Sequence, residues 1–278
     1  MIKKMFLCFL CLSLFLSIPA CKKKAPETPD VPAIIDPTAQ SITVTSTSDM
    51  FHIGTSETFM AMVTMSDGAI KAVVGGVWGT DNPSVATVVP ATGQVTIVGS
   101  GMVSIFVDYE GRRGSKTIRG LPNYQGTWSG TYRITSCIAT GDFDLAGFCD
   151  VFTIGTVLIV ELNLIQDDDR VEGRFLLGEL GADTNGPVST DGQLVLSGTI
   201  SGGTTMIEVV MLLQSITPGQ ISGRLNQIWR DTSVPGDLRL ESDIQELNRI
   251  STMAMALSAG RQLLNPTLQD LIRALLRR

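Results

Sequence analysis

The sequence contains very little histidine and few aromatic or charged side chains. Among 278 residues there is one histidine, His52, while aromatic residues make up 6% and charged residues 17%. Histidine is the commonest general base and the commonest metal ligand in proteins, so its scarcity argues against catalysis or metal binding that depends on it. No GxSxG, HExxH, GxGxxG, P-loop or EF-hand pattern is present. We therefore expect no enzyme, no catalytic residue, no metal site and no cofactor.

Positive charge is also scarce. Lys and Arg number 21 against 27 Asp and Glu, which gives a formal net charge of -6. Nucleic-acid phosphates require a concentrated basic face, so we expect no nucleic-acid partner. Hydrophobic residues make up 44% of the chain, and this fraction excludes wholesale disorder. The length allows one or two domains.

The first 20 residues are typical of a secretory signal peptide. Lys3 and Lys4 precede an apolar run, Met5–Ile18, that is too short for a comfortable membrane span. The run ends in Ile18-Pro19-Ala20-Cys21, which resembles the lipobox of bacterial lipoproteins. An ordinary signal peptide followed by an incidental cysteine is the alternative.

The lipoprotein resemblance implies that the chain is cut before Cys21 and that this cysteine carries lipid such as palmitate. Two or three acyl chains would then anchor the protein stably to a membrane. Lys22 stands where an Asp would retain the protein at the inner membrane, which implies the outer membrane, on its periplasmic or its surface face. Four of the twelve prolines fall in residues 21–40, so this segment is predicted to be an extended linker.

Residues 41–120 contain short alternating runs separated by turn residues, a pattern that predicts an immunoglobulin-like β-sandwich. Trp78, the segment Asp81–Val88, Gly93-x-Val95 and Gly99-x-Gly101 resemble a group 2 bacterial immunoglobulin-like (Big) domain. This resemblance implies a surface spacer or adhesin stalk, in some members with carbohydrate binding, and it supplies no catalytic residues. Trp78 is predicted to be a core residue.

Residues 124–250 alternate with unusual regularity and predict an eight-stranded antiparallel up-and-down β-barrel with no helix between its strands. Closure would remove exposed strand edges, and glycines on the inward face would allow tight coiling. Gly126-x-Trp128 resembles the first strand of calycin (lipocalin- and avidin-like) barrels. The predicted strands are Gly126–Thr135, Thr156–Gln166, Val171–Leu177, Pro187–Thr190, Leu194–Ile200, Thr205–Gln214, Ile221–Trp229 and Leu238–Ile244.

Three aromatic residues of this barrel are the candidate ligand-binding residues. The alternation directs Trp128, Tyr132 and Trp229 inward, where they either line a cavity for a small apolar ligand or simply fill the barrel. The two indoles are predicted to share one cavity or form one plug. Cys137 and Cys149 remain once Cys21 is lipidated, and in an exported protein they are predicted to form a disulfide.

Residues 251–278 are helical in character, with Asn265 as N-cap, Pro266 at the first helical position and an amphipathic stripe of leucines. This helix is expected to pack on the barrel, or else to contact a membrane surface or a partner helix. The whole pattern predicts a lipid-anchored, non-catalytic binding module of the cell envelope, whose partner is a small apolar ligand or an envelope protein or glycan. The alternatives are an envelope hydrolase that uses carboxylates at the barrel rim, and a purely structural surface protein.

Overall fold

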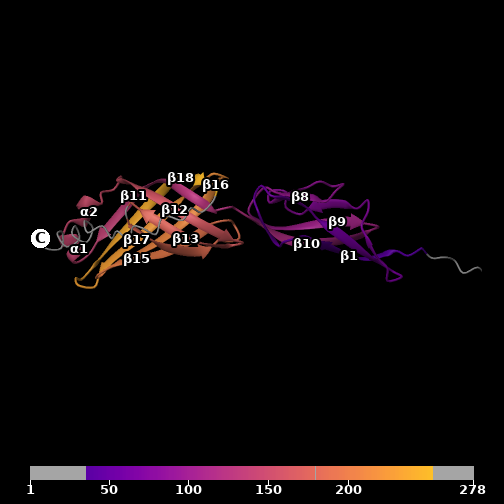
Figure 1. Ribbon diagram of the computed structural model, residues 1–278, viewed down its shortest axis with the longest axis horizontal. Coiled ribbons are helices and arrows are strands. Elements are labelled where there is room, and N and C mark those ends of the chain that lie inside the picture. Colours follow the sequence, from indigo (N-terminus) through magenta and orange to yellow (C-terminus); the bar gives the residue numbers. More distant parts are fainter. Residues whose placement is uncertain (1–35, 179, 253–278) are drawn as a thin grey trace, which may run out of the picture. The chain divides into compact units, whose positions relative to one another are not determined.

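The structure, a computed structural model, describes residues 36–178 and 180–252 (Figure 1). The predicted signal peptide, Cys21, most of the linker and the C-terminal helix lie outside the described residues. Within them the regular secondary structure is almost entirely β-strand, with two four-residue helices, which confirms the all-β prediction. No helix among the described residues is long and apolar enough to cross a membrane.

The first part of the chain forms three small sheets with the predicted sandwich-like character. Neighbouring strands are antiparallel, except that β2 and β10 run parallel. The sheets are β1 (Ala39–Thr45), β4 (Met60–Met65) and β5 (Ile70–Ala72); β2 (Met50–His52), β10 (Arg112–Leu121), β9 (Gly101–Tyr109) and β6 (Val77–Thr80); and β3 (Ser56–Thr58), β8 (Gln94–Ile97) and β7 (Ala86–Val88). Sequence patterning missed β10, because Arg112, Arg113 and Lys116 interrupt its apolar alternation.

The three sheets share one hydrophobic core, and Trp78 belongs to it as predicted. The Trp78 side chain is buried among Val85, Val95, Val107 and other aliphatic residues. A Cβ atom on Gly93 would lie 2.7 Å from the Trp78 ring, so only glycine allows the chain to pass this close to the indole.

The second part of the chain closes into an eight-stranded barrel (Figure 1). Each strand pairs antiparallel with the next along the chain, and the first pairs with the last, so the predicted up-and-down topology is confirmed. The strands are β11 (Gly126–Ala139), β12 (Val157–Asp167), β13 (Arg170–Leu177), β14 (Leu180–Pro187), β15 (Leu194–Gly202), β16 (Thr205–Thr217), β17 (Gln220–Asp231) and β18 (Asp237–Ser251).

Inward-facing glycines bring neighbouring strands very close together. At five of them, a Cβ atom would lie only 1.6 to 2.5 Å from a carbonyl oxygen of the next strand, a distance that no side chain can tolerate. These residues are Gly130, Gly173, Gly186, Gly198 and Gly223. They permit the strong coiling that a small closed barrel needs.

Two details of the predicted barrel are wrong. The fourth strand is Leu180–Pro187 rather than Pro187–Thr190, because Gly178 takes a left-handed conformation and turns the chain directly back along β13. The sequence pattern did not predict β14 because the strand consists mostly of small and turn-forming residues, although Ala182 and Thr184 both face inward. The loop between β11 and β12 also contains two helices, α1 (Asp142–Leu145) and α2 (Phe148–Val151), where no helix was expected.

Candidate functional site

The barrel interior contains the three predicted ligand-binding residues. Trp128, Tyr132 and Trp229 are only 1%, 4% and 3% exposed, as their inward alternation predicted. They belong to one large hydrophobic cluster that reaches around the barrel and includes side chains from all eight strands. Among its members are Leu162, Phe175, Ala182, Leu196, Met211, Leu225 and Leu240. The barrel is therefore packed with its own side chains, and the ligand-binding role of the three aromatic residues stays a prediction.

Trp128 lies at the end of the barrel where the chain enters. Its Nε1 donates a hydrogen bond of 2.8 Å to the carbonyl oxygen of Tyr124, and the Arg249 guanidinium stacks 4.4 Å above its ring. Tyr124 is fully buried, and its hydroxyl donates to Gly192 O at 2.7 Å. The same hydroxyl accepts from Ser215 N at 3.2 Å, so it links the segment before β11 to the C-terminal end of β16.

Gln166 completes the closure of this end. Its Oε1 accepts from Tyr124 N at 2.6 Å, and its Nε2 donates to Pro122 O and Asp168 O at 3.1 and 2.8 Å. Sequence patterning assigned no role to Gln166 or Tyr124. The available signal was weak: a glutamine on the apolar face of β12, and one of only three tyrosines in the chain.

Trp229 lies at the other end of the barrel, beneath the helical loop. Its Nε1 donates to Gln227 Oε1 at 3.1 Å, and its ring centroid lies 5.3 Å from that of Phe152. Phe143 and Phe148 pack against each other with centroids 5.0 Å apart, and both are completely buried. Three phenylalanines from one loop therefore cover this end of the barrel.

The prediction that the two indoles share one cavity or plug is wrong. Trp229 pairs with Leu238, which in turn pairs with Ala139 on β11. Ala139 is eleven residues along β11 from Trp128. Because a strand rises about 3.3 Å per residue, the two rings occupy opposite ends of the barrel. Strand order alone correctly placed them two strands apart, but it carries no information about height along the barrel.

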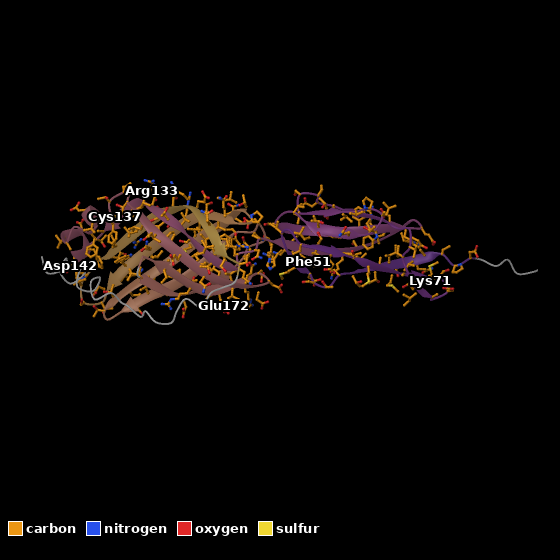
Figure 2. The ribbon with its side chains drawn as sticks, turned by 45° about the horizontal axis from the view of Figure 1, so that its top comes forward. Phe51, Lys71, Arg133, Cys137, Asp142 and Glu172 are labelled. Carbon is orange, nitrogen blue, oxygen red and sulfur yellow. A yellow bond between two sulfur atoms is a disulfide. The ribbon has the colours of Figure 1, made fainter. Side chains whose placement is uncertain are left out.

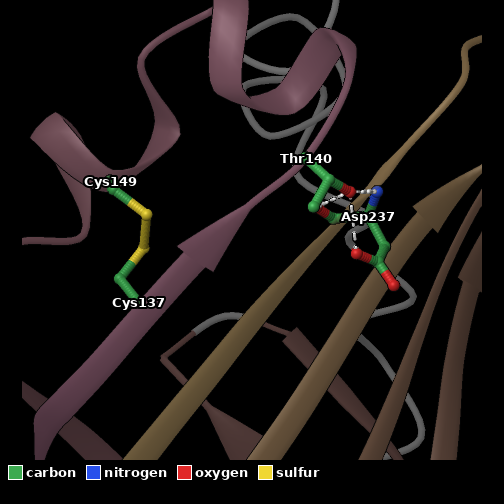
Figure 3. The surroundings of a disulfide bond; sticks show 4 residues. All are labelled: Cys137, Thr140, Cys149 and Asp237. Atoms are coloured by element: carbon green, nitrogen blue, oxygen red, sulfur yellow. Dashed lines mark hydrogen bonds between the residues drawn. A yellow bond between two sulfur atoms is a disulfide. The ribbon is translucent and has the colours of Figure 1, made fainter.

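The disulfide between Cys137 and Cys149 is present as predicted (Figure 3). It joins the end of β11 to α2 and thereby fixes the phenylalanine-bearing loop. Beside it, Thr140 Oγ1 accepts from Asp237 N and donates to Asp237 Oδ1, both at 2.9 Å. The pKa of Asp237 is lowered mainly by a hydrogen bond from Arg239 and, to a smaller extent, by one from Thr140. The loop is thus attached to β18 as well as to β11.

Two polar side chains lie within the apolar interior. Gln227 and Ser242 are 3% and 2% exposed, and among the described residues the Ser242 hydroxyl has no hydrogen-bond partner. Burial raises the pKa of Tyr132. Gln227 and Ser242 therefore place polar atoms inside the otherwise apolar barrel.

The outer face of β12, β13 and β14 carries two adjoining shallow hollows. Both include Ile165, Glu172 and Asn185. The register aligns outward-facing residues, all polar except Ile165, across the three strands: Asn163 with Arg174 and Asp183, then Ile165 with Glu172 and Asn185. Figure 2 shows Glu172 on this part of the barrel. The face, which we call the β12–β14 face, presents both charge signs and amide groups around one exposed isoleucine.

Four described carboxyl groups, those of Asp108, Asp191, Asp231 and Asp237, have shifted pKa values. Each described carboxyl group whose pKa is shifted has a lowered pKa, and hydrogen bonds are responsible. At Asp231 burial opposes the shift, but hydrogen bonds from Ser233, Thr205 and Thr204 outweigh it. Within residues 36–178 and 180–252, no group of three or more metal-ligating side chains could hold a metal ion.

Comparisons with known proteins give little guidance. No protein-family model matches the chain, and no curated protein matches it. A search of solved structures returns the S-layer protein rSbsC(31-844) at 11% identity and a TM-score of 0.27. The match covers 73% of this chain and 39% of that protein. At this level of similarity the match carries no argument about fold or function.

Proposed function

We propose that this protein is a lipid-anchored, non-catalytic interaction module of the cell envelope, with the sandwich acting as a spacer for the barrel. Its partner in this proposal is an envelope protein or glycan. The lipobox-like Ile18-Pro19-Ala20-Cys21 supports the anchor and the location at the outer membrane. The disulfide in the barrel agrees with an oxidising compartment.

The observation that carries the proposal is the filled barrel interior. Trp128 and Trp229 both donate their indole N–H groups to other parts of the chain rather than leaving them for a ligand. Hydrogen bonds of Tyr124 and Gln166 close one end and three phenylalanine rings close the other, so in this proposal the partner binds the outside of the barrel. The β12–β14 face offers hydrogen-bond donors, acceptors and both charges there, as polar recognition requires.

Site-specific photo-crosslinking tests this interaction role. A photoreactive side chain replaces Asn185 on the β12–β14 face, and Thr199, an exposed outward residue of β15, serves as the matched control. We expect an envelope protein or glycan to crosslink at Asn185 and not at Thr199. Equal products at the two positions, or none at Asn185, would contradict the use of this face.

The anchor and the closed interior require separate tests. Cys21→Ser should abolish incorporation of labelled palmitate and release the protein from membranes, and continued labelling would exclude Cys21 as the lipid attachment site. For the interior, an added fatty acid should leave tryptophan emission unchanged. Saturable quenching that Trp128→Phe removes would instead favour a small apolar ligand inside the barrel.

A further inference from the structure

The stretch of chain from α1 through α2 into β12 exposes several large aliphatic side chains. These side chains are 46% to 84% exposed. This apolar flank consists of Leu145, Val151, Ile154, Val157 and Ile159. We take this run of exposed apolar side chains as a candidate contact surface.

Acidic residues border the apolar flank. Asp142, Asp144 and Asp150 belong to the same two helices, and none of them forms an ion pair with another described residue. Figure 2 shows Asp142 at this helix-bearing end of the barrel. Arg133 is a nearby cation, and its guanidinium donates to Gly155 O at 3.3 Å. The border therefore has an excess of negative charge.

The sequence after β18 has the complementary composition. Its apolar stripe is Leu268, Leu271, Ile272, Leu275 and Leu276. Arg273, Arg277 and Arg278 accompany this stripe, and Asp270 is the only acid in residues 253–278. A helix over residues 266–278 would present leucines to an apolar surface and guanidinium groups to carboxylates.

The chain is long enough to bring these two surfaces together. Ser251, at the end of β18, pairs with Thr127, and four residues further along β11 Thr131 pairs with Ile159 of the flank. At about 3.3 Å per residue, the near edge of the flank lies about 13 Å along β11 from the end of β18. The thirteen residues 253–265 can span up to about 43 Å when extended.

We propose that residues 266–278 dock on the apolar flank of the same chain, with their arginines facing Asp142, Asp144 and Asp150. A tethered segment has a local concentration in the millimolar range, so even a weak intrinsic affinity keeps it bound. An anionic membrane surface is disfavoured as the occupant because the bordering carboxylates would repel it. This inference does not depend on the proposed interaction partner or on the lipid anchor.

Photo-crosslinking of the full-length exported protein tests the docking. The photoreactive residue replaces Val157 or Ile154 on the flank, with Thr199 on β15 as the exposed control. We expect products within one chain, mapped by mass spectrometry to residues 266–278, at least about fivefold above those from Thr199. The triple change Asp142→Asn, Asp144→Asn and Asp150→Asn should lower this yield severalfold without reducing the melting temperature.

Each other outcome overturns the proposal. A product of twice the protein mass would assign the flank to a second copy, and a lipid adduct would assign it to a membrane. A product with a different protein would assign it to an external partner. Yields no higher than at Thr199 would leave residues 266–278 unconnected to the flank. Unchanged crosslinking in the triple variant would contradict the proposed orientation, in which the arginines face the three aspartates.

Discussion

The two ends of the barrel are closed by different kinds of interaction. At the Trp128 end, Tyr124 and Gln166 close the barrel through hydrogen bonds to backbone groups. At the Trp229 end, a loop between β11 and β12 closes it with three phenylalanine rings, held in place by the Cys137–Cys149 disulfide. Polar closure depends on donors, acceptors and their protonation, whereas apolar closure depends on keeping the loop in place. The two ends should therefore respond to different perturbations.

The largest effect is expected from removing an indole. Trp128→Ala should lower the free energy of unfolding by about 3–5 kcal/mol, because it deletes a buried ring and leaves the Tyr124 carbonyl oxygen without its donor. Urea unfolding followed by circular dichroism measures this loss. Thr199→Ala, at an exposed position of β15, is the control and should change stability by less than about 0.5 kcal/mol. A loss below about 1 kcal/mol for Trp128→Ala would show that the ring is not part of the packed interior.

Loss of the disulfide should loosen the Trp229 end of the barrel more than the Trp128 end. The double change Cys137→Ser and Cys149→Ser releases cysteines 12 positions apart, and loop entropy predicts a loss of about 3 kcal/mol. Hydrogen exchange should accelerate more at the amides of Phe148 and Phe152 than at Tyr124, where it should rise only with the loss of global stability. Equal acceleration at both ends would mean that the two ends open together, which contradicts their independent closure.

The smallest effect concerns the polar end at high pH. Burial raises the pKa of Tyr124 to about 12, against about 10 in an unfolded chain. The neutral hydroxyl therefore stabilises the fold fully below about pH 10, and this contribution is lost at up to about 1.4 kcal/mol per pH unit as the pH rises towards 12.

Tyr124→Phe should remove this pH dependence, so that its free energy of unfolding falls less steeply than that of the unaltered protein between about pH 10 and 12. At neutral pH the same change should cost about 1–3 kcal/mol, because the Ser215 amide loses its acceptor. Tyr132→Phe is the matched control, since burial also raises the pKa of Tyr132. It should leave the Tyr124 contribution intact, and identical pH profiles for Tyr124→Phe and the unaltered protein would contradict the burial of the hydroxyl.

Much of the barrel could be predicted from residue alternation. The inward direction of Trp128, Tyr132 and Trp229 follows from the two-residue period of a strand, which depends only on local geometry. The disulfide followed from counting cysteines in a chain that was predicted to be exported. Strands β14 and β10 were harder to predict from the sequence. Gly, Asp and Asn disturb the alternation in β14, and several cations disturb it in β10. Both strands have a weak local preference for β-structure. Hydrogen-bonded pairing with β13 stabilises β14, and pairing with β9 stabilises β10.

The sequence by itself therefore determined the fold class, the number of barrel strands, the inward face and the cysteine pair. All of these depend on periodicity or composition along a short stretch of chain. Only the tertiary structure decided which residues close each end of the barrel and that the two indoles lie far apart. Tyr124 and Gln166 are separated by more than forty residues and meet only because β11 pairs with β12 in a fixed register. Register and stagger are properties of the closed barrel as a whole, so no local pattern encodes them.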